Sequence, residues 1–222
     1  KNSPRLFKRP NLKNEAKLNI LLIQDMPRLY TTNIQSSFLH FSEYCKFVKK
    51  QSQFINNLDP EKKDKIIVRL GSVLETFSSN NLYHYEKKIW KKNISQIRTE
   101  SRNIPIDGSI KNAYVIVITQ ICSTVLLECL TSNIPFIVYY DPKQQVINKE
   151  FKKDISKLKN SNIIFTDAKK LSDFLNKNNA KSIFDWWDSK KMQSIIKILQ
   201  EKYARYRPDY LEELKNVLLT RN

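Results

Sequence analysis

Glycine is almost absent from this chain, which has only two glycines among its 222 residues, Gly71 and Gly108. Glycine-rich phosphate loops of the GxGxxG and GxxxxGK kinds need several residues without a Cβ atom where the backbone approaches the phosphate. The scarcity of glycine therefore argues against a dinucleotide site of the GxGxxG kind and against a P-loop.

Residue types that bind metals or attack substrates are also few. The three cysteines, Cys45, Cys122 and Cys129, have no CxxC spacing and fall in apolar patterns, so the sequence predicts neither a zinc site nor a disulfide framework. The two histidines, His40 and His84, form no cluster, and the sequence has no GxSxG motif. We therefore expect no metal site, no serine hydrolase, and a reducing, cytoplasmic environment.

Long apolar runs are missing as well, because no run approaches the roughly 20 residues that cross a bilayer. The first residues also lack the pattern of a signal peptide. The chain opens with a polar stretch over residues 1–17, which we expect to be an irregular lead-in or linker within a longer polypeptide. Residues 18–222 then form one domain.

The charge is strongly positive, with a formal net value of +17 at pH 7. Only nine of the 39 basic residues are arginine, and the lysines sit mostly in doublets spread over several predicted helices. Most of them fit solvated helix faces, with attraction to an anionic substrate or peripheral contact with an anionic inner membrane as the alternative. Because arginines are few and no known nucleic-acid module is present, we expect no nucleic-acid partner.

Short apolar runs alternate with helical patterns along the chain. This alternation predicts an α/β fold with a Rossmann-like, doubly wound parallel sheet, which binds ligands at the carboxyl ends of its strands. The predicted strands cover residues 18–23, 65–70, 94–97, 114–119, 136–140 and 163–165. The predicted helices cover residues 36–58, 83–92, a short segment after Pro105, and residues 123–132, 143–159, 168–178, 190–203 and 209–219.

The most informative segment joins the strand at 114–119 to the next helix. The strand is followed by Gln120, and the helix opens with Ser123 and Thr124, either of which can cap it while the free amides of the first turn face a ligand phosphate. Glu128 lies one turn after Thr124, where its carboxylate could accept hydrogen bonds from ribose hydroxyls. The alternative is that Ser123 is only a helix cap and Glu128 a solvated or ion-paired side chain.

Other polar residues follow neighbouring strands. Arg69 closes the strand at 65–70, as either a phosphate or sugar-carboxylate clamp or a structural ion-pair partner. Asp141 follows the strand at 136–140, as either a cleft residue or part of a turn, and Arg28 lies in the polar loop after the first strand. Trp186 and Trp187 are expected to be packing anchors first and a sugar-stacking platform second.

Several of these motifs together resemble the C-terminal half of a bacterial family of transferases found with surface-polysaccharide genes for O-antigen or capsule. Towards the start, the resemblance covers the strand LNILLI, the run Pro27-Arg28-Leu29-Tyr30, the long helix ending in Leu58, and Ile67-Val68-Arg69-Leu70. Further on, it covers Ser123-Thr124, Leu127-Glu128, Leu130, Asn133-Ile134-Pro135, Asp141-Pro142, Trp186-Trp187 and Lys202-Tyr203-Ala204-Arg205.

The resemblance implies a GT-B glycosyltransferase, in which two Rossmann-like domains face a cleft and the C-terminal domain, with helices packed against it, holds a nucleotide sugar. It adds weight to Ser123, Thr124 and Glu128 as donor-binding residues and to Arg69 as a cleft residue. The expected reaction transfers a sugar from a CMP-, UDP- or GDP-linked donor to a cell-surface glycan or lipid-linked acceptor, with no cofactor and with an unassigned catalytic base. The alternatives are a non-catalytic module that binds a glycan or polyanion, and a nucleotide-sugar epimerase.

Overall fold

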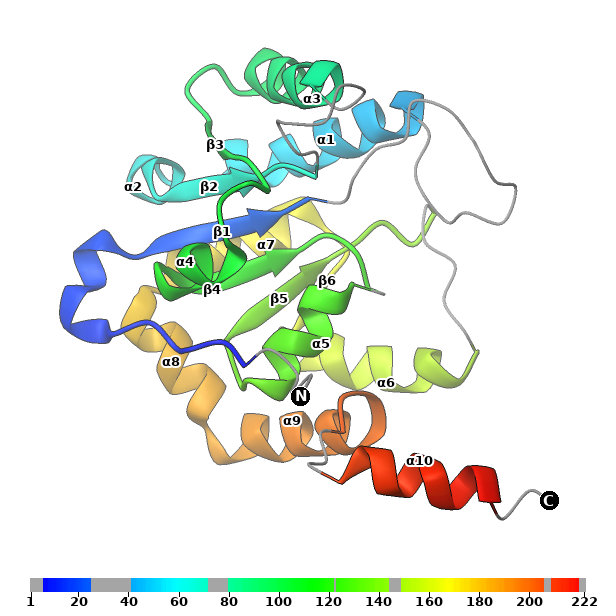
Figure 1. The fold of residues 1–222 in the computed structure, drawn as a ribbon. Helices are drawn as coiled ribbons and strands as arrows, with labels where there is room; N and C mark the ends of the chain where they lie inside the picture. The colour runs from blue at the N-terminus through cyan, green and yellow to red at the C-terminus, as the bar shows by residue number, and fades with distance from the viewer. Residues whose placement is uncertain are drawn as a thin grey trace.

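The chain folds around one six-stranded sheet with the order β3-β2-β1-β4-β5-β6, in which every pair of neighbours is parallel (Figure 1). The structure is a computed structural model and describes residues 6–24, 41–71, 80–121, 123–143, 149–205 and 209–219. The strands are β1 (Asn19–Ile23), β2 (Ile66–Arg69), β3 (Arg98–Glu100), β4 (Ala113–Ile118), β5 (Phe136–Tyr139) and β6 (Ile164–Phe165).

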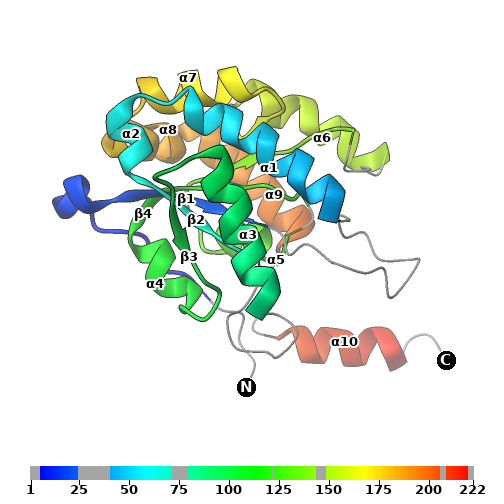
Figure 2. The same cartoon turned by 90° about the horizontal axis from the view of Figure 1, so that it is seen from above.

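Helices cover both faces of the sheet and bury its apolar side chains in two clusters. On one face pack α1 (Phe41–Asn56), α3 (Asn80–Asn93), α7 (Ala168–Lys177) and the first part of α8 (Ala180–Asp188). On the other pack α4 (Ile106–Lys111), α5 (Thr124–Thr131), α6 (Lys149–Asn160) and α9 (Lys190–Tyr203). Seen from above, α7 lies on the opposite side of the strands from α4 and α5 (Figure 2). The remaining elements are a 3-10 helix, η1 (Leu12–Lys17), α2 (Pro60–Asp64) and α10 (Tyr210–Leu219).

The prediction of a doubly wound α/β fold is confirmed, and its physical basis is the continuous apolar character of the central strands. All six residues of β4 are buried, as are four of the five residues of β1. Strands covered by helices on both faces need apolar side chains at every position, so they read as uninterrupted apolar runs.

The edge strand was placed wrongly at residues 94–97. The structure has β3 at Arg98–Glu100, preceded by a turn in which the Ile97 amide donates to the Ile94 carbonyl at 3.3 Å. Ile97 is buried and Ile94 packs against the same core, so both isoleucines fill the core from a loop. β3 lies at the edge of the sheet, where one side of a strand has no paired neighbour. Its three residues are polar, so the sequence showed no apolar run there.

Three helices also differ from the predictions. The structure adds α2 and α8, which were not predicted, and the described part of the helix expected over 143–159 begins at Lys149. Lys143 lies instead in a turn, where its amide donates to Asp141 Oδ1 at 3.0 Å. The short helix α2 follows from Pro60 at its start, since proline favours the first turn of a helix and ends the one before it.

The segment expected to be an irregular lead-in packs against the domain over its described residues. It contains η1, and the side chain of Phe7 is buried in the cluster that includes α5 and α9. The Phe7 amide donates to Ser132 Oγ at 2.9 Å. Within this segment Phe7 therefore belongs to the core, while η1 itself buries no residue.

Asparagine replaces glycine at two helix ends. Asn133 and Asn162 have φ values of 53° and 58° and follow α5 and α6. After α5, the Ile134 amide donates to the Cys129 carbonyl at 2.9 Å, and the Asn133 amide to the Leu130 carbonyl at 3.1 Å. This is the Schellman pattern, in which a left-handed residue ends a helix, and asparagine tolerates that conformation better than other side chains.

Candidate functional site

The start of α5 lies at the topological switch point of the sheet. From β1 the chain builds β2 and β3 on one side, then returns to place β4 on the other side of β1 (Figure 1). In open α/β sheets, ligands bind in the crevice outside the carboxyl ends of the strands that flank such a reversal. β4 ends at Ile118, and α5 begins at Thr124. The helix start is thus at the edge where this fold class binds ligands.

Ser123, one of the two residues that the sequence offered as a cap, is the N-cap of α5. Its backbone is extended, with φ −82° and ψ 137°, and its Oγ accepts a hydrogen bond from the Val125 amide at 3.2 Å. Thr124 is exposed, whereas Ser123 is half-buried. A helix start carries partial positive charge and outward-pointing amides, so this end of α5 is suited to an anion.

Two buried glutamines lie beside this switch point and were missed by the sequence analysis. Gln24 directly follows β1, and its Nε2 donates to Oε1 of Gln51 on α1. Within the described chain, Gln24 Oε1 and Gln51 Nε2 have no hydrogen-bond partner, although both side chains are buried. Exchanging the nitrogen and oxygen positions of both side-chain amides reverses the hydrogen bond between them, but one amide nitrogen and one amide oxygen are still left without a partner. The only signal in the sequence was a polar residue ending an apolar strand.

Arg69 is held by protein groups. The guanidinium is buried and forms an ion pair with Glu100 through Nη1, while Nη2 donates to the Ile104 carbonyl at 2.7 Å and the Arg102 carbonyl at 3.4 Å. Nη1 also lies 3.4 Å from Ser109 Oγ. The arrangement is the ion-pair alternative that the sequence left open, and contact of Arg69 with a ligand stays a prediction.

Other predicted site residues are spread over the same edge of the sheet. Glu128 is half-buried on α5, one turn after Thr124, and Gln120 is half-buried just after β4. Arg28 lies outside the described residues. The roles of these residues in binding stay predictions.

Asp141 lies just after β5, where protein groups bind its carboxylate. Its carboxylate forms an ion pair with Lys50 of α1, accepts from the Lys143 amide at 3.0 Å, and is only 10% exposed. Burial by itself would raise the pKa of Asp141, but the hydrogen bonds and charges of Lys50 and Lys143 outweigh it and hold the pKa below its ordinary value. Asp141 therefore takes the predicted turn position and is ionised at neutral pH.

A cavity of about 510 Å³ opens beside Asp141. Residues from α1, from the end of β5 and from the turn between β6 and α7 line it, and among the predicted site residues it includes only Asp141. The sequence could not reveal this cavity, because Lys50 and Asp141 are 91 positions apart.

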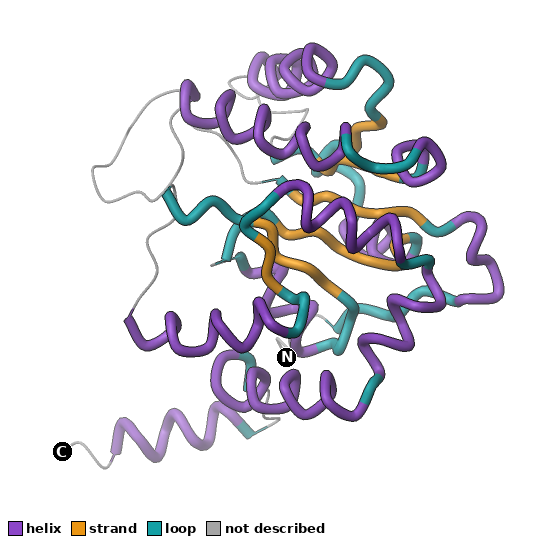
Figure 3. The backbone as a smooth tube through the Cα atoms, turned by 180° about the vertical axis from the view of Figure 1, so that it is seen from behind, coloured by secondary structure: helices purple, strands orange, loops and turns teal. Residues whose placement is uncertain are grey.

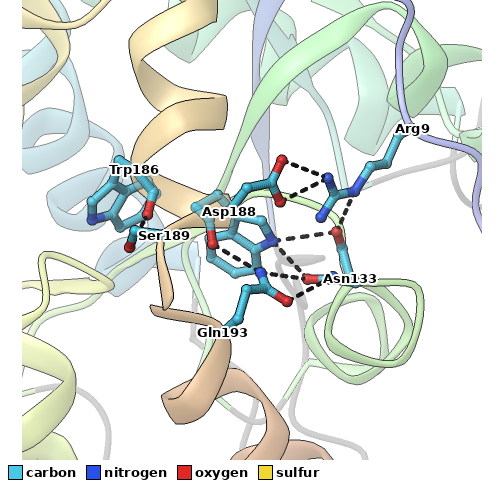
Figure 4. Close-up of polar contacts among 7 residues, drawn as sticks. Arg9, Asn133, Trp186, Asp188, Ser189 and Gln193 are labelled. Carbon is cyan, nitrogen blue, oxygen red and sulfur yellow. Dashed lines mark hydrogen bonds and ion pairs between the residues drawn. The ribbon is translucent and has the colours of Figure 1, made fainter. Parts of the chain in front are cut away.

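Asn133 and Trp187, two residues that carried the family resemblance, belong to one structural network (Figure 4). The Trp187 indole is fully buried, and its Nε1 donates to Asn133 Oδ1 at 2.8 Å and to the Asn133 carbonyl at 3.2 Å. Arg9 donates to the same carbonyl at 2.7 Å and pairs with both oxygens of Asp188 at 2.9 and 3.0 Å. Gln193 Nε2 donates to the Trp187 carbonyl at 2.8 Å. The network joins the lead-in, the end of α5 and the α8–α9 corner, so the prediction that Trp187 anchors packing is confirmed.

Neither metal binding nor membrane crossing finds support in the part of the chain that the structure describes. No group of three or more His, Cys, Asp or Glu side chains there is arranged to hold a metal ion. No helix there is both long and apolar enough to span a bilayer.

Comparison with known proteins assigns the family. A family profile described as "LIC12162 family transferase" matches residues 2–218. No curated protein matches the chain. Because the profile match spans nearly all of the 222 residues, the chain belongs to the LIC12162 family of transferases.

Proposed function

We propose that this chain binds the donor in a glycosyltransferase of the GT-B type, which moves a sugar from a CMP-, UDP- or GDP-linked donor to a cell-surface glycan or lipid-linked acceptor. The reaction needs no further cofactor and takes place on the cytoplasmic side of a membrane. Membership in a transferase family supports transfer over the epimerase and the binding-module alternatives.

The observation that carries the proposal is the position of α5. Its start follows β4 at the switch point of a parallel sheet, and Ser123 caps it with a hydroxyl. An acidic cap would repel a phosphate, whereas a hydroxyl cap leaves the positive helix end available to one.

The chemistry proposed for this site is electrostatic. Ser123 Oγ already accepts from the Val125 amide, so its own hydrogen can be donated to a phosphate oxygen. The amides of the first turn stabilise the charge that develops on the departing nucleotide phosphate, and such stabilisation is commonly the largest contribution to this kind of catalysis. Glu128, one turn further along α5, is placed to bind the ribose hydroxyls. The acceptor hydroxyl is activated by a base that we leave unassigned.

The positive charge of the chain bears on where the reaction takes place. A formal net charge of +17 favours peripheral contact with an anionic membrane surface, where a lipid-linked acceptor is found. Nucleic acid is not part of the proposal.

Calorimetric titration of the full-length protein with CMP, UDP and GDP tests the donor site. We expect at least one nucleotide to bind, and Ser123→Ala to weaken that binding roughly tenfold to a hundredfold, as expected for loss of a hydrogen bond to a charged group.

Ser189→Ala is the matched control. Ser189 is the N-cap of α9, where its Oγ accepts from the Met192 amide at 3.3 Å. Both substitutions remove a serine cap and cost about 1 kcal/mol of stability, but only the change at Ser123 touches the proposed phosphate site. The proposal fails if no nucleotide binds, or if the two variants weaken binding equally.

A further inference from the structure

The cavity beside Asp141 differs in chemistry from the start of α5, although both lie along one edge of the sheet. β4 and β5 are neighbours, so their carboxyl ends are one strand spacing apart, about 4.8 Å. The cavity opens on the face covered by α1 and α7, which pack against each other, whereas α5 covers the opposite face. Figure 3 shows the molecule from behind, with helices lying across that side of the sheet.

The charges around the cavity cancel. Lys50 and Lys169 line it together with Asp141 and Asp167, so the ionic groups contribute no net charge. Asp167 is also the N-cap of α7, where its Oδ1 accepts from the Lys170 amide at 2.8 Å. Its carboxylate therefore neutralises the positive start of that helix, and a phosphate gains little at this place.

Hydrogen-bonding groups of both kinds converge on the cavity. The ionised carboxylate of Asp141 accepts, the ammonium of Lys50 donates, and the exposed amide of Gln53 on α1 does both. A ligand that offers several hydroxyls close together, each of them donor and acceptor, matches such a set.

Aromatic side chains supply the apolar part of the wall. Phe47 and Tyr139 are largely buried and line the cavity. Burial, followed by the charges of Asp167 and Asp141, raises the pKa of Tyr139 to about 12, so its hydroxyl is neutral at physiological pH. The C–H face of a sugar ring packs on such rings while its hydroxyls bind polar groups at the rim.

We propose that this cavity binds a pyranose ring with neighbouring free hydroxyls. Its volume of about 510 Å³ lies within the roughly 300–1,000 Å³ typical of ligand pockets. The inference rests on the proposed transferase function, in which a sugar comes either from the acceptor glycan or from the nucleotide donor. Either source brings the same ring chemistry to the edge of the sheet beside the α5 start.

Saturation-transfer NMR on the full-length protein tests the site with methyl α-D-glucopyranoside, methyl β-D-galactopyranoside and methyl α-D-mannopyranoside as probes. We expect at least one glycoside to bind, and Lys50→Ala and Gln53→Ala each to weaken it at least about fivefold. Lys49→Ala is the control, because Lys49 is an exposed neighbour on α1 outside the cavity lining, and we expect it to leave binding unchanged.

Competition distinguishes the two sources of the sugar. The competitors are the nucleotide that binds in the calorimetric titration and its sugar-linked form. If the nucleotide sugar displaces a bound glycoside and the nucleotide alone does not, the cavity binds the sugar of the donor; if neither displaces it, the cavity binds the acceptor. The inference is overturned if none of the three glycosides binds, if Lys49→Ala weakens binding as much as Lys50→Ala, or if the nucleotide alone displaces the glycoside.

Failure of this inference can be told apart from failure of the proposed function. Nucleotide binding that responds to Ser123→Ala but not to Lys50→Ala, together with no glycoside binding, refutes only the sugar cavity. Glycoside binding without any nucleotide binding refutes the donor site instead.

Discussion

Arg69 gives the sharpest test of how the structure assigns roles to the polar residues at the edge of the sheet. The proposed change is Arg69→Met, which keeps most of the length of the side chain and removes its charge and all its donors. The change leaves Glu100 without its ion-pair partner in a site where only 13% of its side chain is exposed. It also removes the donor that binds the Ile104 carbonyl at 2.7 Å.

The expected cost is large because the partner left behind stays buried. Breaking a buried ion pair by removing one member destabilises a protein by about 3–5 kcal/mol. For a chain of this size each kcal/mol lowers the melting temperature by roughly 2–4 °C, so Arg69→Met should lower it by about 6–20 °C. Adding Glu100→Gln should recover part of the loss, since the double variant no longer buries an unpaired charge.

Urea unfolding followed by tryptophan fluorescence measures the free energy of unfolding of each variant. Arg98→Met is the matched control, because Arg98 is exposed and donates to Asn19 Oδ1 at 2.9 Å. Its loss should cost less than about 1 kcal/mol. The structural assignment of Arg69 is refuted if Arg69→Met unfolds within 1 kcal/mol of the unchanged protein, roughly the cost allowed for an exposed contact, while nucleotide affinity falls.

Three further predictions follow from buried groups. Trp187→Phe should lower the free energy of unfolding by roughly 1–3 kcal/mol in the same urea assay, because it leaves Asn133 without the indole donor at 2.8 Å, and an unchanged value would contradict this. In the folded protein the pKa of Asp141 lies below its ordinary value of 3.8. The ionised carboxylate therefore stabilises the fold above pH 3.8, and this stability is lost as the pH falls through the pKa of the folded state. Below about pH 4, the melting temperature of the unchanged protein should therefore fall more steeply with decreasing pH than that of Asp141→Asn, and parallel slopes would count against the Lys50 ion pair. Burial raises the pKa of the Cys129 thiol far above its usual range, so iodoacetamide at pH 8 should modify Cys129 only in urea, as peptide mass spectrometry can show; an adduct in the native protein would refute its burial.

The central strands and most helices could be predicted because their signals are local. β1 and β4 are apolar at consecutive positions, α9 was predicted with its observed ends, and the serine cap of α5 depends on residues two positions apart. Where the local signal was weak, the prediction failed. β3 is a polar edge strand, and the isoleucines before it fill the core from a turn.

What the sequence by itself determined is therefore the fold class, the alternation of strands and helices, and a capped helix start after a buried strand. The tertiary structure alone decided that Arg69 binds Glu100, that Gln24 meets Gln51, and that a cavity forms between α1 and the ends of β5 and β6. These outcomes depend on which strands become neighbours and on which face each helix packs, and residues 27 to 91 positions apart meet only after that order is established. Apolar periodicity reports whether a residue is buried, but it carries no information about the partner that the residue meets there.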